Sequence, residues 1–372
     1  MSQTTLYGTP VSLYTGNARS YLIKAGIDYR ETTHSSAYYR DEVLPKAGGR
    51  QGIPTIELGD GTVIRDGAAI IDHFEAISGH TFSPKSPKQR ILSRLFDVIG
   101  SDGLLRPALH YRWSFPEENR AFLMFHFESV IPAGPERSEH AVTAAKFAKM
   151  FGGVTGVAPE TMELIETLYL ELLGKLDRHF GQHPYLLGGR PCLGDFGMMR
   201  PLYAHLGRDP KPLSIMQANA IRVFRWVERM NRPEPDVGEF ETQSDAYLAD
   251  DQVPDSLIDA LKHIAIDFIP ETRAAADCIN QWIDDQQALA PGTPIARGVG
   301  MCSFTIRDVT INALAQPYRF FLLKRVQDEF LLLDDASQQE VQALLAACDM
   351  SDVLNIRLTR DVGLSKNLEV WL

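Results

Sequence analysis

The chain has 372 residues, of which 44% are hydrophobic and 23% are charged, and its formal net charge is −11. This length predicts two or three domains, since a domain usually spans about 100–200 residues, and the composition is that of a globular protein. The acidic balance and the lack of a dense Lys and Arg run argue against nucleic acid as a partner, because a phosphate backbone requires clustered cations.

Membrane and secretory classes are not indicated either. No segment approaches the ~20 apolar residues of a membrane span, and residues 1–10 lack the basic and apolar regions of a secretory signal. Neither the histidines nor the cysteines show metal-type spacing, and there is no Cys-x-x-Cys pair. We therefore expect a cytoplasmic protein that binds no metal and keeps its cysteines reduced and mostly buried: Cys192, Cys278, Cys302 and Cys348.

The first 80 residues are predicted to begin with a strand, a helix and a second strand. Residues 5–7 can start a strand, and residues 18–25 have helical apolar spacing that ends at Gly26, a common helix stop. Residues 27–31 can form the next strand. The polar stretch 34–50, which contains one proline and a pair of glycines, is typical of an irregular helix and loop.

A hairpin and a further helix follow. Residues 54–58 and 62–64 flank a Gly-Asp-Gly tripeptide, a strong signal for a tight hairpin. Asp66 is then expected to cap a helix that closes at Gly79. This order of elements, with one crossover helix, predicts a small four-stranded mixed sheet.

The rest of the chain is predicted to be mainly helical. A Pro- and Ser-containing linker at 78–88 precedes a stretch, 89 to about 230, with an apolar period near 3.6. From residue 251 a third stretch begins, in which we expect two helices, a strand or bulged strand, and another helix, at 257–268, 273–286, 303–312 and 314–333. The predicted domains are 1–80, 89–250 and a mostly helical extension, 251–372.

The candidate chemistry lies at the start of the first helix, where the chain reads Ser12-Leu13-Tyr14-Thr15. Without a cysteine here, this site has no thiolate for disulfide exchange. A hydroxyl at a helix N-terminus can instead donate a hydrogen bond to the thiolate of a bound ligand. The alternative is that Ser12 is only a helix cap. Tyr7, Tyr14 and Thr15 are the other hydroxyls near enough in sequence to take this role, although Tyr7 lies on the predicted first strand, where a packing role is more typical.

Two more features lie nearby. Ile53 and Pro54 precede a predicted strand, and a cis bond between them would present the Ile53 backbone to an extended peptide. Asp66 and Gly67 begin the next helix, whose bare amides favour an anionic group such as a carboxylate. In both cases the alternative is an ordinary strand start or helix cap.

Together these features resemble the glutathione transferase superfamily. The resemblance covers about residues 5–240 and rests on four segments: LYGTPVSLYTGNARSYLIKAGIDY, IPTIELGDGTVIRDGAAIIDHFE, PYLLGGRPCLGDFGMMRPLYAHL and FRWVERMNRPEP, at 6–29, 53–75, 184–206 and 224–235. It implies a thioredoxin-like α/β domain followed by an all-helical transferase-type domain. It also implies a homodimer that uses glutathione as co-substrate and acts on a small electrophile.

The resemblance also implies roles for residues. Ser12 would activate the thiol, and Tyr14 and Thr15 are the alternatives for this role. The Ile53 backbone beside Pro54 would pair with the cysteinyl unit of glutathione. Asp66 and Gly67 would hold the γ-glutamyl end. An aromatic group on the helical domain, consisting of His110, Tyr111 and Trp113, would line a second-substrate site, although such a cluster is more often core.

Three departures from the family pattern stand out. Gly67 replaces the serine that usually follows the acidic residue, so one hydroxyl for the ligand is missing. The alternative is that glycine stands here because another group needs the space. Cys192 replaces the Ser or Thr of the helical domain's capping box. The extension has no counterpart in typical members, which leaves a non-catalytic binding or scaffold protein as the alternative function.

Overall fold

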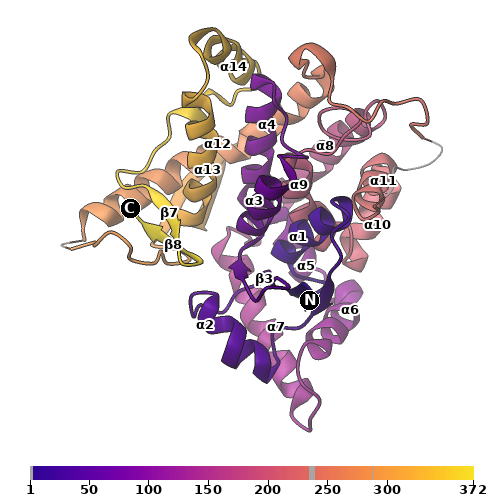
Figure 1. Ribbon diagram of the computed structural model, residues 1–372, viewed down its shortest axis with the longest axis vertical. Coiled ribbons are helices and arrows are strands. Elements are labelled where there is room, and N and C mark those ends of the chain that lie inside the picture. Colours follow the sequence, from indigo (N-terminus) through magenta and orange to yellow (C-terminus); the bar gives the residue numbers. More distant parts are fainter. Residues whose placement is uncertain (1–2, 234–238, 287) are drawn as a thin grey trace.

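The computed structural model describes residues 3–233, 239–286 and 288–372. The last two residues of the fourth resembling segment, 234 and 235, lie outside these ranges. In Figure 1 the chain begins as a small sheet with its helices, continues as a helical region, and ends in a group of helices and hairpins beside α3 (Gly67–Ser78) and α4 (Pro87–Val98). Among the described residues there is no helix with the length and apolar character of a bilayer span.

The N-terminal part contains the predicted four-stranded mixed sheet. Its strands lie in the order β2-β1-β3-β4; β1 and β2 are parallel, and the other pairs are antiparallel. The strands are β1 (Thr5–Tyr7), β2 (Arg30–Thr32), β3 (Thr55–Glu57) and β4 (Val63–Arg65). Helix α1 (Leu13–Lys24) starts earlier than predicted, because Ser12 caps it. A π-helix η1 (Tyr39–Val43) and the short α2 (Leu44–Lys46) complete this part, as the irregular stretch predicted.

The predicted helical region is confirmed. It runs from α4 through the π-helix η2 (Ile99–Gly103), α5 (Leu105–Trp113), α6 (Pro116–Ser129), α7 (Arg137–Val154), α8 (Met162–Phe180), α9 (Leu193–Ala204), α10 (Pro210–Asn219) and α11 (Ile221–Met230). Cys192 occupies the N-cap of α9, and its backbone N–H donates to Asp195 at 2.9 Å. Cysteine therefore does not prevent this capping box from forming.

The extension differs from its prediction in two places. The two helices expected at 257–268 and 273–286 are wrong: α12 (Asp255–Asp284) is one helix that continues through Pro270. Burial of its apolar face compensates for the backbone hydrogen bond that proline removes, since Leu257, Phe268 and Ile279 are fully buried.

The expected single strand is instead a hairpin. It consists of β5 (Met301–Ile306) and β6 (Val309–Leu314), and the chain reverses at Arg307 and Asp308, both with positive φ. The remaining elements are η3 (Ala249–Asp251), α13 (Pro317–Leu331), α14 (Asp335–Ala347), η4 (Ser351–Leu354), β7 (Val362–Ser365) and β8 (Leu368–Trp371).

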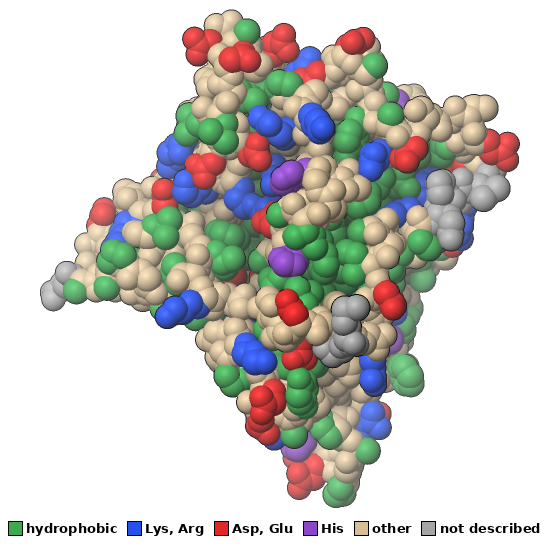
Figure 2. Space-filling view, viewed as in Figure 1, with side chains coloured by type: hydrophobic (Ala, Val, Ile, Leu, Met, Phe, Trp, Pro, Cys, Tyr) green, Lys and Arg blue, Asp and Glu red, His purple; other side chains and the backbone are tan. Residues whose placement is uncertain are grey.

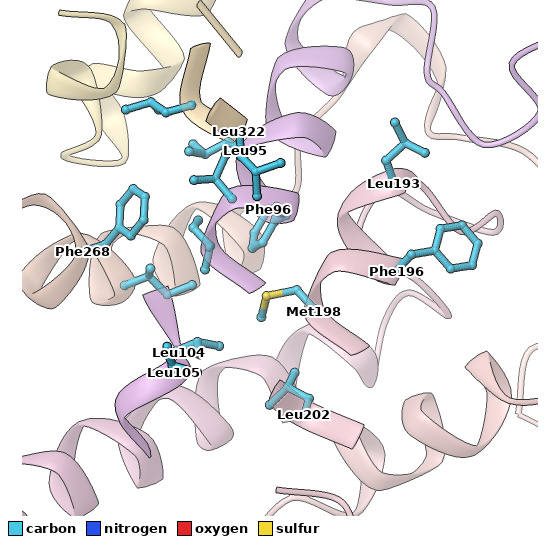
Figure 3. Close-up of a cluster of buried hydrophobic side chains, with 14 of the residues drawn as sticks. Leu95, Phe96, Leu104, Leu105, Leu193, Phe196, Met198, Leu202, Phe268 and Leu322 are labelled. Atoms are coloured by element: carbon cyan, nitrogen blue, oxygen red, sulfur yellow. The ribbon is translucent and has the colours of Figure 1, made fainter. Parts of the chain in front are cut away.

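One hydrophobic core joins all three parts of the chain. In Figure 3, Leu322 of α13 lies beside Leu95 of α4, and Phe268 of α12 approaches the same cluster. Both extension side chains are buried, with at most 1% exposure. The extension therefore packs onto its own chain as an integral layer. Figure 2 shows hydrophobic side chains gathered in the middle of this face, with basic and acidic groups intermixed above them.

Candidate functional site

Ser12 is placed as the sequence predicts, at the N-cap of α1. Its backbone is extended, and its Oγ accepts a hydrogen bond from the Thr15 backbone N–H at 3.2 Å. Because the oxygen acts as the acceptor in this bond, the hydroxyl hydrogen is left to be donated to another group. Ser12 is half-buried, so the cap residue keeps some exposure. Capping and thiol activation are thus compatible roles for one hydroxyl.

The hydroxyls of Thr15 and Tyr14 are less well placed. Thr15 is fully buried against Gly8, where an added Cβ would lie 2.3 Å from the threonine Cγ2. Tyr14 is half-buried, and burial, with Asp102 adding to it, raises the pKa of its phenol well above the usual value. Ser12 is therefore the hydroxyl best suited to meet a ligand.

The loop before Ser12 is held by arginines from three different segments. Each of the three carbonyls ahead of the serine accepts from a guanidinium: Thr9 from Arg19 at 3.1 Å, Pro10 from Arg208 at 2.7 Å and Val11 from Arg112 at 2.9 Å. Arg112 is itself fixed by a bidentate contact with Asp209, at 2.6 and 2.8 Å, in a buried setting. Bonds to charged donors of this kind are strong, so the position of Ser12 is set by the helical region as well as by α1.

The Ile53–Pro54 peptide bond is cis. Ile53 stays half-buried just ahead of β3, while Pro54 is buried. The preceding Gly52 carbonyl accepts from the hydroxyls of Thr55 at 3.0 Å and Tyr39 at 3.2 Å. This turn is thereby fixed from two sides.

Asp66 caps α3 as predicted, with a positive φ of 85° that non-glycine residues rarely adopt. Its Oδ1 accepts from the backbone N–H groups of Ala68 at 2.9 Å and Ala69 at 3.3 Å. Its Oδ2 accepts from the hydroxyl of Tyr318, in α13 of the extension, at 2.8 Å. Burial raises the pKa of the Asp66 carboxyl, and Glu369 adds to this, whereas the Tyr318 hydrogen bond opposes it.

Gly67 is explained by its neighbour in α1. A Cβ at this position would lie 2.4 Å from Oδ1 and 2.9 Å from Nδ2 of Asn17. Asn17 is fully buried, and neither polar atom of its side chain has a hydrogen-bond partner. Of the two explanations for Gly67, the structure supports the need for space, and the group that needs it belongs to α1 rather than to the extension.

The aromatic second-substrate candidates pack mainly as core, as the alternative reading held. His110 is fully buried with its Nε2 2.8 Å from Glu166, and Tyr111 is 1% exposed beside the ring of Tyr169. Only Trp113 is partly exposed. His110 and Tyr111 therefore have no surface with which to contact a substrate.

Sequence reasoning missed the contribution of the extension to this region. Besides Tyr318, the extension brings Arg297, which is exposed and lies two residues after Ile295, whose carbonyl accepts from Arg50 at 3.0 Å. The Arg297 charge partly offsets the effect of burial on the pKa of Tyr14, so Arg297 lies near the start of α1. These residues stand more than 200 positions after Asp66 in the chain, and no local pattern links them to it.

The other reactive groups of the chain are its metal-ligating side chains and its thiols. Among the described residues, no three His, Cys, Asp or Glu side chains gather as a metal site would require. The cysteines are free, and burial raises the pKa of Cys302 and of Cys348 to about 11, so these thiols stay protonated at neutral pH.

A thioredoxin-like domain with a serine-capped first helix and a cis-proline before its third strand, joined to a helical region, is the arrangement that the resemblance to glutathione transferases implies. Residues 6–82 match the family model described as glutathione S-transferase, N-terminal domain. Residues 6–82 therefore form a domain of the glutathione S-transferase N-terminal type.

Several solved structures are similar to this chain. Glutathione transferase GSTFuA3 from Phanerochaete chrysosporium is 15% identical, covering 63% of this chain and 98% of its own, with a TM-score of 0.43. Beta-etherase LigF from Sphingobium sp. strain SYK-6 is 15% identical, covering 62% and 95%, with a TM-score of 0.40. A glutathione S-transferase from Methylobacterium radiotolerans JCM 2831, in complex with glutathione sulfonate, is 16% identical, covering 62% and 90%, with a TM-score of 0.36. Similarity at this level is too low to indicate a shared activity. None of the curated proteins compared with the sequence matches it.

Proposed function

We propose that this chain is a glutathione-dependent transferase, which joins the glutathione thiolate to a small electrophile or uses it to reduce one. The observation that carries the proposal is the position of Ser12. Its hydroxyl caps α1 within a glutathione S-transferase N-terminal domain, and its Oγ already accepts a hydrogen bond from the backbone. Its hydrogen can therefore be donated to a ligand sulfur.

The chemistry follows from the ionisation of the thiol. A free thiol with a pKa near ~8.5 is only a few per cent ionised at pH 7. A hydrogen bond to the charged form is worth roughly 1.5–3 kcal/mol, which lowers the pKa by about one to two units. The N-terminus of α1 adds a further favourable field for an anion. Much of the bound thiol is then nucleophilic at neutral pH.

The remaining groups would hold the tripeptide. The Ile53 backbone beside Pro54 would pair with the cysteinyl unit, and Asp66 with the Gly67 amide would hold the γ-glutamyl end. Arg50 and Arg297 are cations suited to the ligand's glycine carboxylate. The electrophile would approach Ser12 from the side of the helical region.

The test measures glutathione binding and the pKa of the bound thiol, by thermal shift and by thiolate absorbance. We expect binding by the wild-type chain and a rise of about one to two units in the thiol pKa for Ser12→Ala. Ser86→Ala is the matched control, because Ser86 also occupies a helix N-cap, that of α4. An unchanged thiol pKa in Ser12→Ala would remove Ser12 from this role, and no binding at millimolar glutathione would overturn the proposal.

The second candidate is a non-catalytic binding or scaffold protein. It is favoured by Gly67, which brings no hydroxyl to the site, and by Tyr318, which already engages Asp66. Turnover of a model aryl halide with glutathione separates the two functions: binding without turnover, in the presence of a lowered thiol pKa, supports the scaffold.

The proposal includes a cytoplasmic homodimer. Helices α13 and α14 already pack on α4, so two copies would associate through surfaces that the extension leaves open. Light scattering of the full chain measures this directly, and a monomer at micromolar concentration would contradict it.

A further inference from the structure

The extension forms hydrogen bonds with Arg65 and Asp66, the two residues that precede α3. The Arg65 Nη2 donates to both carboxylate oxygens of Glu369 in β8, at 2.7 Å each, and the Arg65 Nε donates to the Asn367 carbonyl. The Arg65 backbone N–H donates to the Asn367 side chain at 3.3 Å. With Tyr318 on Asp66, three extension residues act on this short segment.

Tyr318 and Asp66 together form a pair of acceptors. The phenol has one hydrogen, which it donates to Asp66 Oδ2 over 2.8 Å. The phenol lone pairs and a lone pair of that carboxylate oxygen remain as acceptors. Glu369 acts electrostatically on Asp66, and Arg200 and Arg65 act on it in the opposite sense, so the pair is recognised by its two acceptor oxygens. Two oxygens less than 3 Å apart can share a single ammonium group.

The Asn17 side chain, which lies beside the start of α3, has unused hydrogen-bonding groups. Asn17 is fully buried with its amide against Gly67, and both polar atoms of that amide are unpartnered. Native proteins pair almost all such groups, so the helix start at Asp66 and Gly67 leaves polar capacity unused. A ligand ammonium would bring a donor to the half-buried Asp66 side of this helix start.

We propose that Tyr318 of the extension is a ligand-binding residue, whose phenol oxygen and Asp66 Oδ2 together hold the α-ammonium of a γ-glutamyl ligand. The extension thus completes a site that the first domain provides only in part. This inference rests on the proposed function, since it names the group that binds one end of the same ligand. It also gives residues 251–372 a role in recognition besides packing.

The charged groups around the pair are balanced by fixed partners. Arg65 is neutralised by Glu369, and Arg325 by Asp72. Arg200 is held by Asp97 at 2.8 Å. Asp66, by contrast, forms no ion pair within the described part of the chain and is stabilised by hydrogen bonds, so an incoming ammonium would be its counter-ion.

The test compares two ligands that differ only in the ammonium: glutathione and N-glutaryl-cysteinylglycine. Affinities are measured by calorimetry for wild type, Tyr318→Phe and Tyr247→Phe. The phenylalanine at 318 keeps the ring that lies 5.8 Å from Phe321, so folding is retained, and an unfolding curve checks this. Tyr247→Phe is the matched control, because Tyr247 is also part-buried with one hydroxyl bond, to the Pro191 carbonyl at 3.0 Å.

We expect Tyr318→Phe to weaken glutathione binding about tenfold and to change the affinity for the analogue less than twofold. Tyr247→Phe is expected to leave both affinities unchanged. Equal losses for the two ligands would make Tyr318 a structural residue and overturn the inference, and so would no loss for either ligand; the proposed function is judged separately, by glutathione binding to the wild-type chain. If the wild-type chain binds neither ligand, the proposed function fails and this inference fails with it.

Discussion

The ion pair between Arg65 and Glu369 is the contact most open to a quantitative test. It joins the edge strand β4 to the last strand of the chain, and the two side chains are only 10% and 4% exposed. Removing one partner of a buried pair leaves an uncompensated charge and costs about 3–5 kcal/mol. Glu369→Gln keeps the size of the side chain and one acceptor oxygen, so the lower end of this range, about 3 kcal/mol, is expected.

The assay is urea unfolding followed by tryptophan fluorescence. Trp371 is a natural reporter, since it is 1% exposed, lies two residues from Glu369 and stacks with Trp282 at 5.8 Å. The control is Asp328→Asn, which removes an i,i+4 pair with Lys324 in the same part of the chain. That pair is half-exposed at Asp328, so its loss should cost only about 0.3–0.5 kcal/mol.

A double variant separates the effect of the unpaired charge from the effect of changing the two side chains. Arg65→Met combined with Glu369→Leu removes both charges, and a buried pair replaced by apolar groups is often neutral. The double variant should therefore be more stable than either single one. Two results would refute the claim that this pair fixes the extension. One is a loss of unfolding free energy below about 1 kcal/mol in Glu369→Gln, and the other is a double variant less stable than both single variants.

Two further outcomes are expected. Gly67→Ser should weaken glutathione binding in calorimetry, because the added Cβ would lie 2.4 Å from Asn17 Oδ1. The control is Gly153→Ser, whose added Cβ meets nothing within 4 Å. Tighter binding by Gly67→Ser would contradict the packing argument. Burial lowers the pKa of His179 to about 3, so the folded state keeps it neutral while the unfolded chain takes up a proton below about pH 6.5. Stability should then fall as the pH drops from about 6.5 toward 3, and His179→Gln should flatten this slope by up to about 1.4 kcal/mol per pH unit, measured by urea unfolding across the range; an unchanged slope would count against it.

Local signals explain why the first domain could be predicted from sequence. The Gly-Asp-Gly turn between β3 and β4 and the cap at Asp66 depend on neighbours within a few residues. Both features reflect the short-range conformational preference of a particular residue type. The cis bond at Pro54 was instead an expectation of the family resemblance, because only about 5–6% of X-Pro bonds in folded proteins are cis.

The errors arose where distant contacts override local preference. Pro270 indicated a break, yet α12 passes through it because both halves of the helix bury their apolar faces against other elements. Arg307 and Asp308 are not the usual residues of a tight hairpin turn, so the reversal between β5 and β6 could not be read from them. Long-range packing decides both cases.

The candidate site divides along the same line. Ser12 and Asp66 could be named from their positions at helix starts. Tyr318 could not, because its contact with Asp66 spans 252 positions and depends on how α13 docks. The reason for Gly67 likewise became visible only when Asn17 was seen beside it.

The extension docks on Arg65 and Asp66, and the proposed ligand binds at Asp66, so under that proposal docking and ligand binding are thermodynamically linked. A ligand at ~100 times its dissociation constant stabilises the form that it binds by about 2.7 kcal/mol. That is close to the about 3 kcal/mol expected from the Glu369 contact. If glutathione binds only the docked form, Glu369→Gln must weaken its binding as well as the fold, although Glu369 need not touch the ligand. Equal glutathione affinity in Glu369→Gln and wild type would show that the site is complete without the docked extension.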